Sequence, residues 1–184
     1  MRKYFLLTAL FALMSLCCNA QFKLTPSAGL MTEDGPYTIT KSGSEVENYE
    51  AAKKAVETAI SGAEIGEIEY EKSFSVSAKY KNRGKLPGAL VATDWIIDYT
   101  LKVEVSDEKI LISFAKIGNL EVWKKGEVLQ YIHPTTGKNS MLGDITGNHY
   151  LFNSKGEICK GGKKMVALFE EMANGIVKEI ERNL

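Results

Sequence analysis

The feature that most constrains the fold is a run of alternating side chains between residues 94 and 105. Every odd position is apolar: Trp95, Ile97, Tyr99, Leu101, Val103 and Val105. Polar residues hold most of the even positions, from Asp94 to Glu104. A period of two residues is typical of a strand with one buried and one wet face. Ser106-Asp107-Glu108 can turn the chain into a partner strand over 109–117, so we expect an antiparallel hairpin.

A second alternating stretch runs from residue 68 to residue 80. Its apolar residues occupy even positions: Ile68, Tyr70, Phe74, Val76, Ala78 and Tyr80. Ser73, Ser75, Ser77 and Lys79 fall on the other face. The pattern predicts one buried and one wet face, and it fits either one long bent strand or two strands joined at residues 71–73. A shorter strand is predicted at residues 37–41.

Two segments have the periodicity of amphipathic helices. The first is expected over residues 45–61, since Ser44 and Glu47 have the spacing of a capping box and Gly62 is suited to end the helix. The second is expected over residues 163–182. Its apolar stripe comprises Met165, Phe169, Met172, Ile176 and Ile180, widened by Leu168 and Val177. Helices with one apolar face need a sheet to cover, so we predict a two-layer α+β domain with a curved antiparallel sheet covered on one face by two helices.

The remaining segments have weaker patterns. Residues 22–36 are expected to be irregular, and residues 82–93 to form a loop. The stretch 119–152 is less regular, with short strands suggested at 120–123, 128–132 and 150–152, followed by a turn at 153–156.

The first twenty residues have the organisation of a secretory signal peptide. Arg2 and Lys3 precede an apolar run over residues 4–16, which is shorter than the roughly 20 residues that cross a bilayer. Small residues before Gln21 predict cleavage there. An uncleaved anchor and a lipoprotein modified at Cys17 or Cys18 are the alternatives. We favour the cleaved form, a single domain over residues 21–184 in the periplasm or cell envelope.

The charge balance and the cysteines narrow the class of protein further. Lys and Arg number 23, as do Asp and Glu, which argues against a nucleic-acid partner. Without the signal peptide the net charge is −2, and Cys159 is the one cysteine left, so an intramolecular disulfide is excluded. No second apolar stretch of membrane length follows residue 20. We therefore expect no transmembrane segment in the mature chain, while peripheral attachment to a membrane stays open.

Three segments, within roughly residues 36–118, resemble a known family. They read YTITKSGSEVENYEAAKKAVETAI, IEYEKSFSVSAKYK and WIIDYTLKVEVSDEKILISFAKI. The family is the small exported domain of unknown function that is common in Bacteroidetes, with a fold described as TATA-binding-protein-like (TBP-like). Where that family tends to have a basic-aromatic run, this chain has Ile110-Leu111-Ile112-Ser113-Phe114.

The resemblance implies a fold and a location. It implies a β-α-β(4)-α core at about residues 36–118, an irregular β insertion at 119–160 and the C-terminal helix at 163–182. It also implies an envelope location. It implies no reaction, because the fold name alone does not assign an activity.

Catalytic and metal-binding patterns are weak. Cys159 with His133 or His149 as base is the one nucleophilic combination, and a buried inert thiol is the more common state of such a cysteine. The sequence has no HExxH or CxxC motif, and residues 161–164 (GGKK) lack the pattern of a phosphate loop. Asp94 and Asp98 lie too far apart along a strand to share an ion. We predict neither a metal nor a cofactor.

The aromatic residues of the 119–152 stretch are the best candidates for a binding site. Trp123, Tyr131 and His133 lie outside the strongest periodic segments, and aromatic side chains suit recognition. The alternative for Trp123 is that it closes the edge of the core.

Three functional hypotheses follow. The first is a non-enzymatic module that binds an envelope protein through a sheet edge or the 119–152 insertion. The second is a periplasmic carrier that holds an apolar ligand between sheet and helices, in a pocket bounded by Val76, Tyr99, Phe169 and Met172. The third, a hydrolytic enzyme, needs Cys159 beside a histidine.

Overall fold

The computed structural model describes residues 21–27, 29–85, 90–136 and 147–184. The predicted signal peptide, with Cys17 and Cys18, lies outside the described residues. The elements in chain order are β1 (Lys23–Thr25), β2 (Gly29–Met31), β3 (Tyr37–Thr40), α2 (Glu45–Ala59), β4 (Glu64–Glu69), β5 (Ser73–Gly84), β6 (Thr93–Val105), β7 (Lys109–Lys124), β8 (Glu127–Thr136), β9 (Gly147–Phe152) and α3 (Lys163–Arg182).

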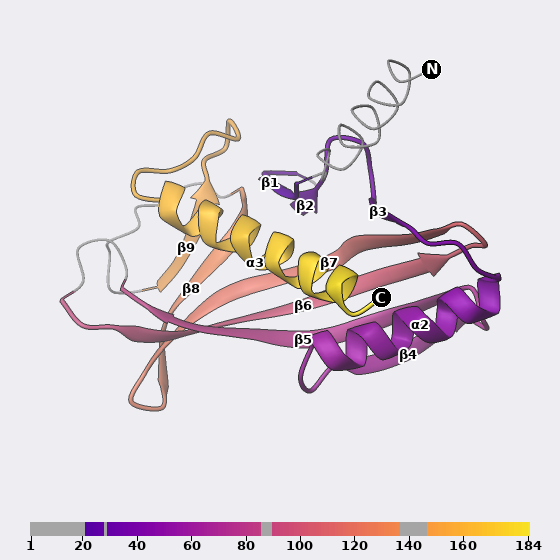
Figure 1. Cartoon of the computed structure of the whole chain (residues 1–184). Coiled ribbons are helices and arrows are strands. Elements are labelled where there is room, and N and C mark those ends of the chain that lie inside the picture. Colours follow the sequence, from indigo (N-terminus) through magenta and orange to yellow (C-terminus); the bar gives the residue numbers. More distant parts are fainter. Residues whose placement is uncertain (1–20, 28, 86–89, 137–146) are drawn as a thin grey trace, which may run out of the picture.

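One large sheet organises the molecule. Its strands follow the order β4-β5-β6-β7-β8-β9, and β3 pairs with the first part of β7. All neighbours are antiparallel except β8 and β9, while β1 and β2 form a separate hairpin. Both helices lie on the same face of the sheet (Figure 1). The predicted α+β class with two layers is therefore confirmed. Four strands, β4–β7, follow α2, and β8 and β9 add two more before α3.

The core lies between the helices and the sheet. Every odd residue of β6 from Trp95 to Val105 is buried, as the alternation predicts. Phe169 of α3 is fully buried against this layer. Tyr49 of α2 meets Phe74 of β5 edge to face, with ring centroids 5.4 Å apart. Burial of these apolar surfaces is the main force that holds the two layers together.

The helix ends follow from local chemistry. Ser44 and Glu47 form the predicted capping box, in which each side chain accepts a hydrogen bond from the other residue's backbone N–H. α2 ends at Ala59, two residues before the predicted end, and the Ile60 N–H still bonds to the Val56 carbonyl. α3 has the predicted bounds.

The stretch 68–80 forms two strands. Glu71 takes a left-handed backbone conformation (φ 58°) in the turn between β4 and β5, and the Lys72 N–H donates to the Glu69 carbonyl. The prediction that Ile68 and Tyr70 share the buried face is wrong, because their exposed fractions are 55% and 69%. A register shift between Glu67 and Glu69 and the tight turn interrupt the alternation that the sequence suggests.

Residues 119–136 are more regular than the sequence indicated. β7 continues to Lys124 and pairs with β8, so this part of the predicted irregular stretch extends the main sheet. Because the register of β7 against β6 shifts twice, the residues of β7 that face the core have an even number at Ile112, an odd number at Ile117 and an even number again at Leu120. Each bulge thus interrupts the period of two that would mark a strand in the sequence. Residues 22–36 also differ from expectation, because they contain the β1–β2 hairpin.

Neither α2 nor α3, the helices of the described residues, is long and apolar enough to cross a membrane.

Candidate binding surfaces

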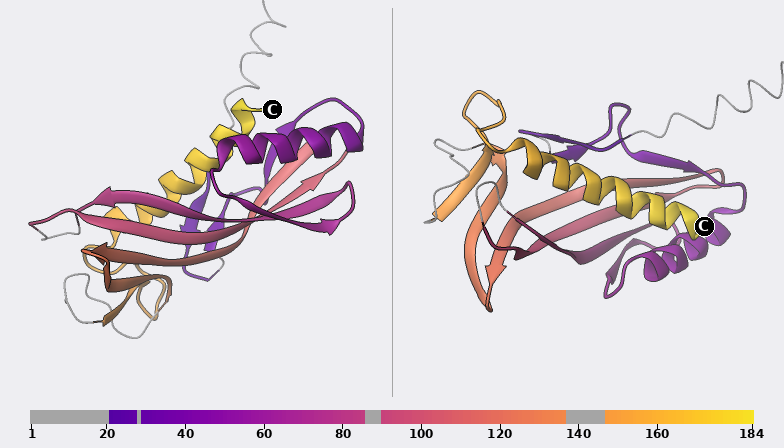
Figure 2. Two further views of the ribbon diagram at one scale, coloured as in Figure 1. Left: turned by 90° about the horizontal axis from the view of Figure 1, so that it is seen from below. Right: turned by 60° about the vertical axis from the view of Figure 1, so that its left-hand side comes forward.

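β5 extends well beyond the strand that pairs with its outer side. β4 pairs only with residues Ser73–Ser77, whereas β6 pairs with β5 as far as Gly84. No described strand therefore pairs with the outer side of Ala78–Gly84, which we call the free edge of β5. Figure 2 shows this part of the strand passing along the border of the sheet, beyond α2 and β4.

In an antiparallel ladder, alternate residues of a strand hydrogen-bond to a given neighbour. This alternation determines which residues of the free edge have N–H and C=O groups available for another strand. The Val105 N–H donates to the Lys72 carbonyl over 2.8 Å, in the register that continues along the whole β5–β6 ladder. Even residues of β5 therefore bond to β6, because hydrogen-bonded pairs alternate in an antiparallel ladder. It follows that the N–H and C=O groups of Lys79, Lys81 and Arg83 point away from β6. The Arg83 N–H is already bonded to the Asn82 side-chain oxygen over 2.7 Å.

The same three residues form a basic row on the face of the sheet turned away from the helices. Lys79 pairs with Asp98 at 3.3 Å, and Arg83 pairs with Asp94 at 3.7 Å. Lys81, at the centre of the row, lies opposite Ile96 and has no acidic partner among the described residues. Its charge is exposed to solvent.

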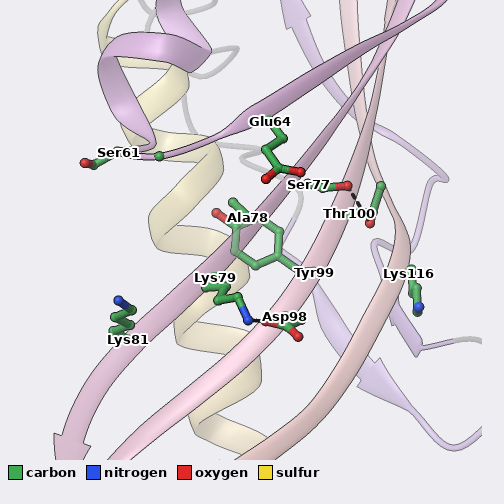
Figure 3. Close-up of a pocket in the computed structure, with 11 residues that line it drawn as sticks. Ser61, Glu64, Ser77, Ala78, Lys79, Lys81, Asp98, Tyr99, Thr100 and Lys116 are labelled. Carbon is green, nitrogen blue, oxygen red and sulfur yellow. Dashed lines mark hydrogen bonds and ion pairs between the residues drawn. The ribbon is translucent and has the colours of Figure 1, made fainter.

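A groove of about 430 Å³ accompanies the start of the free edge. It is bordered by the connection from α2 into β4 and by polar side chains of β5 and β6. In Figure 3 Lys79 reaches Asp98 across the strands, whereas Lys81 stands apart from that ion pair. The Ser77 and Thr100 hydroxyls also meet here, 3.3 Å apart.

A second groove, of about 590 Å³, lies on the helix side of the edge. It is bordered by the end of α2, by β5 and by α3. Its apolar lining is Ala59, Ile60, Tyr80, Tyr99, Met172 and Ile176, and its rim carries Glu171 and Glu179. Burial raises the pKa of Tyr99 to about 12. Of the pocket predicted for a carrier, Tyr99 and Met172 line this groove, whereas Val76 and Phe169 are fully buried in the core.

The three residues predicted from sequence as a binding site share one face of the sheet. Trp123 on β7 and Tyr131 and His133 on β8 alternate with the buried Val122 and Ile132, so they point away from the helices. The Trp123 indole donates to Glu121 over 2.9 Å. Trp123 is half-buried on this face and is not one of the buried core residues.

The structure adds Tyr150 to this aromatic face. Its ring stacks on that of His133 with centroids 4.7 Å apart, because β9 pairs in parallel with β8 and sets the two residues side by side. The His133 Nε2 atom is shielded from solvent and has no hydrogen-bond partner among the described residues. The sequence carried no signal for this contact, since strand pairing across a long connection is not encoded locally.

The residues of the nucleophile hypothesis lie on β8, on β9 and just beyond the end of β9. Cys159 is buried beyond the end of β9, where its N–H donates to the Leu151 carbonyl over 2.9 Å. His149 is buried on the inner face of β9, and His133 stacks on Tyr150. Among residues 21–27, 29–85, 90–136 and 147–184, no group of three His, Cys, Asp or Glu side chains has the geometry of a metal site.

Comparison with known proteins gives one similar structure. No family model matches the sequence, and no match is found among curated proteins. The crystal structure of a DUF4468 family protein from Bacteroides ovatus is similar to this chain, with 14% sequence identity and a TM-score of 0.48. The match covers 88% of this chain and 93% of the other. The sequence itself also resembles a Bacteroidetes family of unknown function.

Proposed function

We propose that the protein is an exported, non-enzymatic module of the cell envelope that binds an extended segment of a protein partner along the free edge of β5. The observation that carries the proposal is the outward set of backbone groups on Lys79, Lys81 and Arg83. An added strand would satisfy the outward N–H and C=O groups of Lys79 and Lys81 and the outward carbonyl of Arg83 by continuing the ladder, which is a recurrent mode of peptide recognition.

The surroundings of the edge support such a partner. Backbone hydrogen bonds contribute only about 0.5–1.5 kcal/mol each, so a short added strand needs side-chain contacts as well. The two grooves lie beside the edge and offer these contacts to alternate side chains of the partner. Lysines along the edge oppose indiscriminate strand pairing, a device that natural sheets use against aggregation.

Export is supported by the sequence of residues 1–20, which has the organisation of a signal peptide. Directly after the predicted cleavage position, Phe22 is 1% exposed, and its backbone is held by two hydrogen bonds to the Asn174 side chain. Gln21, the residue after the predicted cleavage position, is exposed.

A proline substitution tests the edge directly. Lys81→Pro removes an outward N–H without breaking the bonds to β6, and Lys81→Ala removes the same side chain but keeps the N–H. We expect wild-type protein to retain a partner from a detergent extract of the native envelope, Lys81→Ala to retain the same partner less strongly, and Lys81→Pro to lose it. Equal retention of that partner by all three proteins, each with an unchanged circular dichroism spectrum, contradicts the proposal.

We further propose the aromatic face of Trp123, Tyr131, His133 and Tyr150 as a second contact surface of the same module. It is supported by the stacked His133–Tyr150 pair and by the exposure of Tyr131. Tyr131→Ala is expected to weaken partner retention in the same extract while leaving the β5 edge intact. Unchanged retention contradicts this second surface alone.

The carrier hypothesis has less support. The groove on the helix side has an apolar floor but charged borders, with Lys79, Lys81, Glu171 and Glu179 around it. A site for an apolar ligand is mostly enclosed by apolar side chains. Lipid that co-purifies with the exported protein would favour this alternative.

A further inference from the structure

We infer that the partner segment of the free edge alternates acidic and apolar residues, with the acidic side chains beside Lys79, Lys81 and Arg83. This inference rests on the proposed function and specifies the chemistry of the partner. Three observations support the inference: the charges on the outer side of the edge, the apolar lining on its inner side, and the repulsion between like charges if a second copy of this chain paired with the same edge.

The outer side of the edge favours acidic residues. Side chains that lie opposite each other on neighbouring strands are about 4.5–5.5 Å apart at their Cβ atoms, so an added strand sets its outward residues beside the basic row. Lys79 and Arg83 each have one aspartate on β6, and Lys81 has none among the described residues. A carboxylate opposite Lys81 would give this lysine the acidic neighbour that Lys79 and Arg83 already have on β6.

The inner side of the edge favours apolar residues. Alternate side chains of an added strand point toward α3, where Tyr80, Met172 and Ile176 line the groove. Glu171 and Glu179 border this groove together with Lys79 and Lys81, so its charges balance and its apolar lining decides the kind of side chain that fits. The two sides thus select opposite kinds of residue, and they fix which face of the partner strand turns inward.

A second copy of this chain does not fit the edge. In an antiparallel pair, residues whose N–H and C=O groups face the partner strand lie opposite each other. On this edge those residues are Lys79, Lys81 and Arg83, so every antiparallel register places a cation opposite a cation. Like charges directly opposite each other destabilise a sheet. Antiparallel pairing of this edge with itself is therefore unfavourable, and the charges favour a different segment of complementary charge.

Peptide binding tests the inference. The probes are three labelled eight-residue peptides: alternating valine and glutamate, alternating valine and lysine, and four valines followed by four glutamates. Their binding to the exported full chain is followed by fluorescence anisotropy. We expect the alternating glutamate peptide to bind about tenfold more tightly than either other peptide, because several opposite-charge pairs add.

Charge reversal supplies the matched control. Lys81→Glu is expected to weaken binding of the alternating glutamate peptide about tenfold and to strengthen that of the lysine peptide, whereas Lys124→Glu, on the exposed end of β7, changes neither. If the lysine peptide binds as tightly as the glutamate peptide, and Lys81→Pro abolishes the binding of both, the inference of an acidic partner is wrong. The proposal that the β5 edge binds a strand then still holds. No binding of any peptide at millimolar concentration, or binding that Lys81→Pro does not change, overturns both.

Discussion

Asn48 shows how a single polar residue holds the framework of the sheet together. It is fully buried at the start of α2, and its side-chain amide donates to the carbonyls of Lys41, Ser106 and Asp107 over 3.0–3.2 Å. These bonds tie the end of β3 and the β6–β7 turn to the helix. No local pattern singles this residue out, because two of its three partners lie 58 and 59 residues away in the chain.

Replacement of Asn48 tests this role. We expect Asn48→Ala to lower the free energy of unfolding by about 1–3 kcal/mol, because buried carbonyls lose their donor. Asn183→Ala is the control, since its side-chain bond to the Glu179 carbonyl is exposed and should matter by less than about 0.5 kcal/mol. Urea denaturation measures both variants, and equal effects would contradict the assignment.

Two glycines are expected to respond to alanine with opposite signs. A Cβ atom on Gly118 would lie 2.8 Å from the Asp98 carbonyl oxygen, so Gly118→Ala should destabilise the bulged part of the β6–β7 ladder. A Cβ atom on Gly175 meets nothing within 4 Å, so Gly175→Ala should stabilise α3 by about 0.5–1 kcal/mol. Thermal unfolding of the two variants gives the signs, and the same sign for both would refute the argument.

At the scale of elements, the sequence predicted what local periodicity encodes. α3 and the alternation of β6 were predicted correctly, because each is an uninterrupted pattern with one buried face. The long course of β7 was missed, since its bulges reverse the parity at Ile117. The free edge of β5 was missed too, because residues 82–84 were assigned to a loop and nothing local indicates where β4 stops pairing. Of the candidate site, three aromatic residues were predicted and Tyr150 was not.

The N-terminal hairpin is an element attached by side chains of α3. Asn174 binds the Phe22 backbone at both its N–H and its C=O, and Glu170 accepts from the Leu24 N–H over 3.1 Å. We expect Asn174→Ala to speed amide exchange at Phe22 and Leu24 by at least about tenfold relative to α3. Glu171→Ala, one turn away on an exposed position, should leave that ratio unchanged. If the exchange rates of Phe22 and Leu24 relative to α3 are the same in Asn174→Ala and in wild type, other contacts hold the hairpin.

At the scale of the whole molecule, stability should fall at alkaline pH. Burial raises the pKa of Tyr99 to about 12, and burial together with the adjacent Glu181 carboxylate raises that of Tyr37 to about 12. Both exceed the ordinary value of 10.0. The unfolded chain therefore releases these protons first, so the stabilisation is complete below pH 10 and is lost as the pH rises toward 12.

The tyrosines can be separated from other titrating groups by substitution. Tyr99→Phe should reduce the loss of unfolding free energy between pH 9 and pH 12, because unfolding of the variant releases about one proton fewer in this range. Urea titrations at several pH values measure the slope for wild type and variant. An identical slope would show that Tyr99 does not contribute to alkaline unfolding.

The central claim, that β5 presents unpaired backbone groups beyond Ser77, is tested most directly by amide hydrogen exchange of the isolated protein, resolved by residue in NMR spectra. Tyr80 and Asn82 bond to β6 and should exchange slowly, whereas Lys79 and Lys81 should exchange rapidly. This alternation of slow and fast amides is the result that the account predicts. Slow exchange at all four residues would mean that the edge is already occupied and would contradict the account.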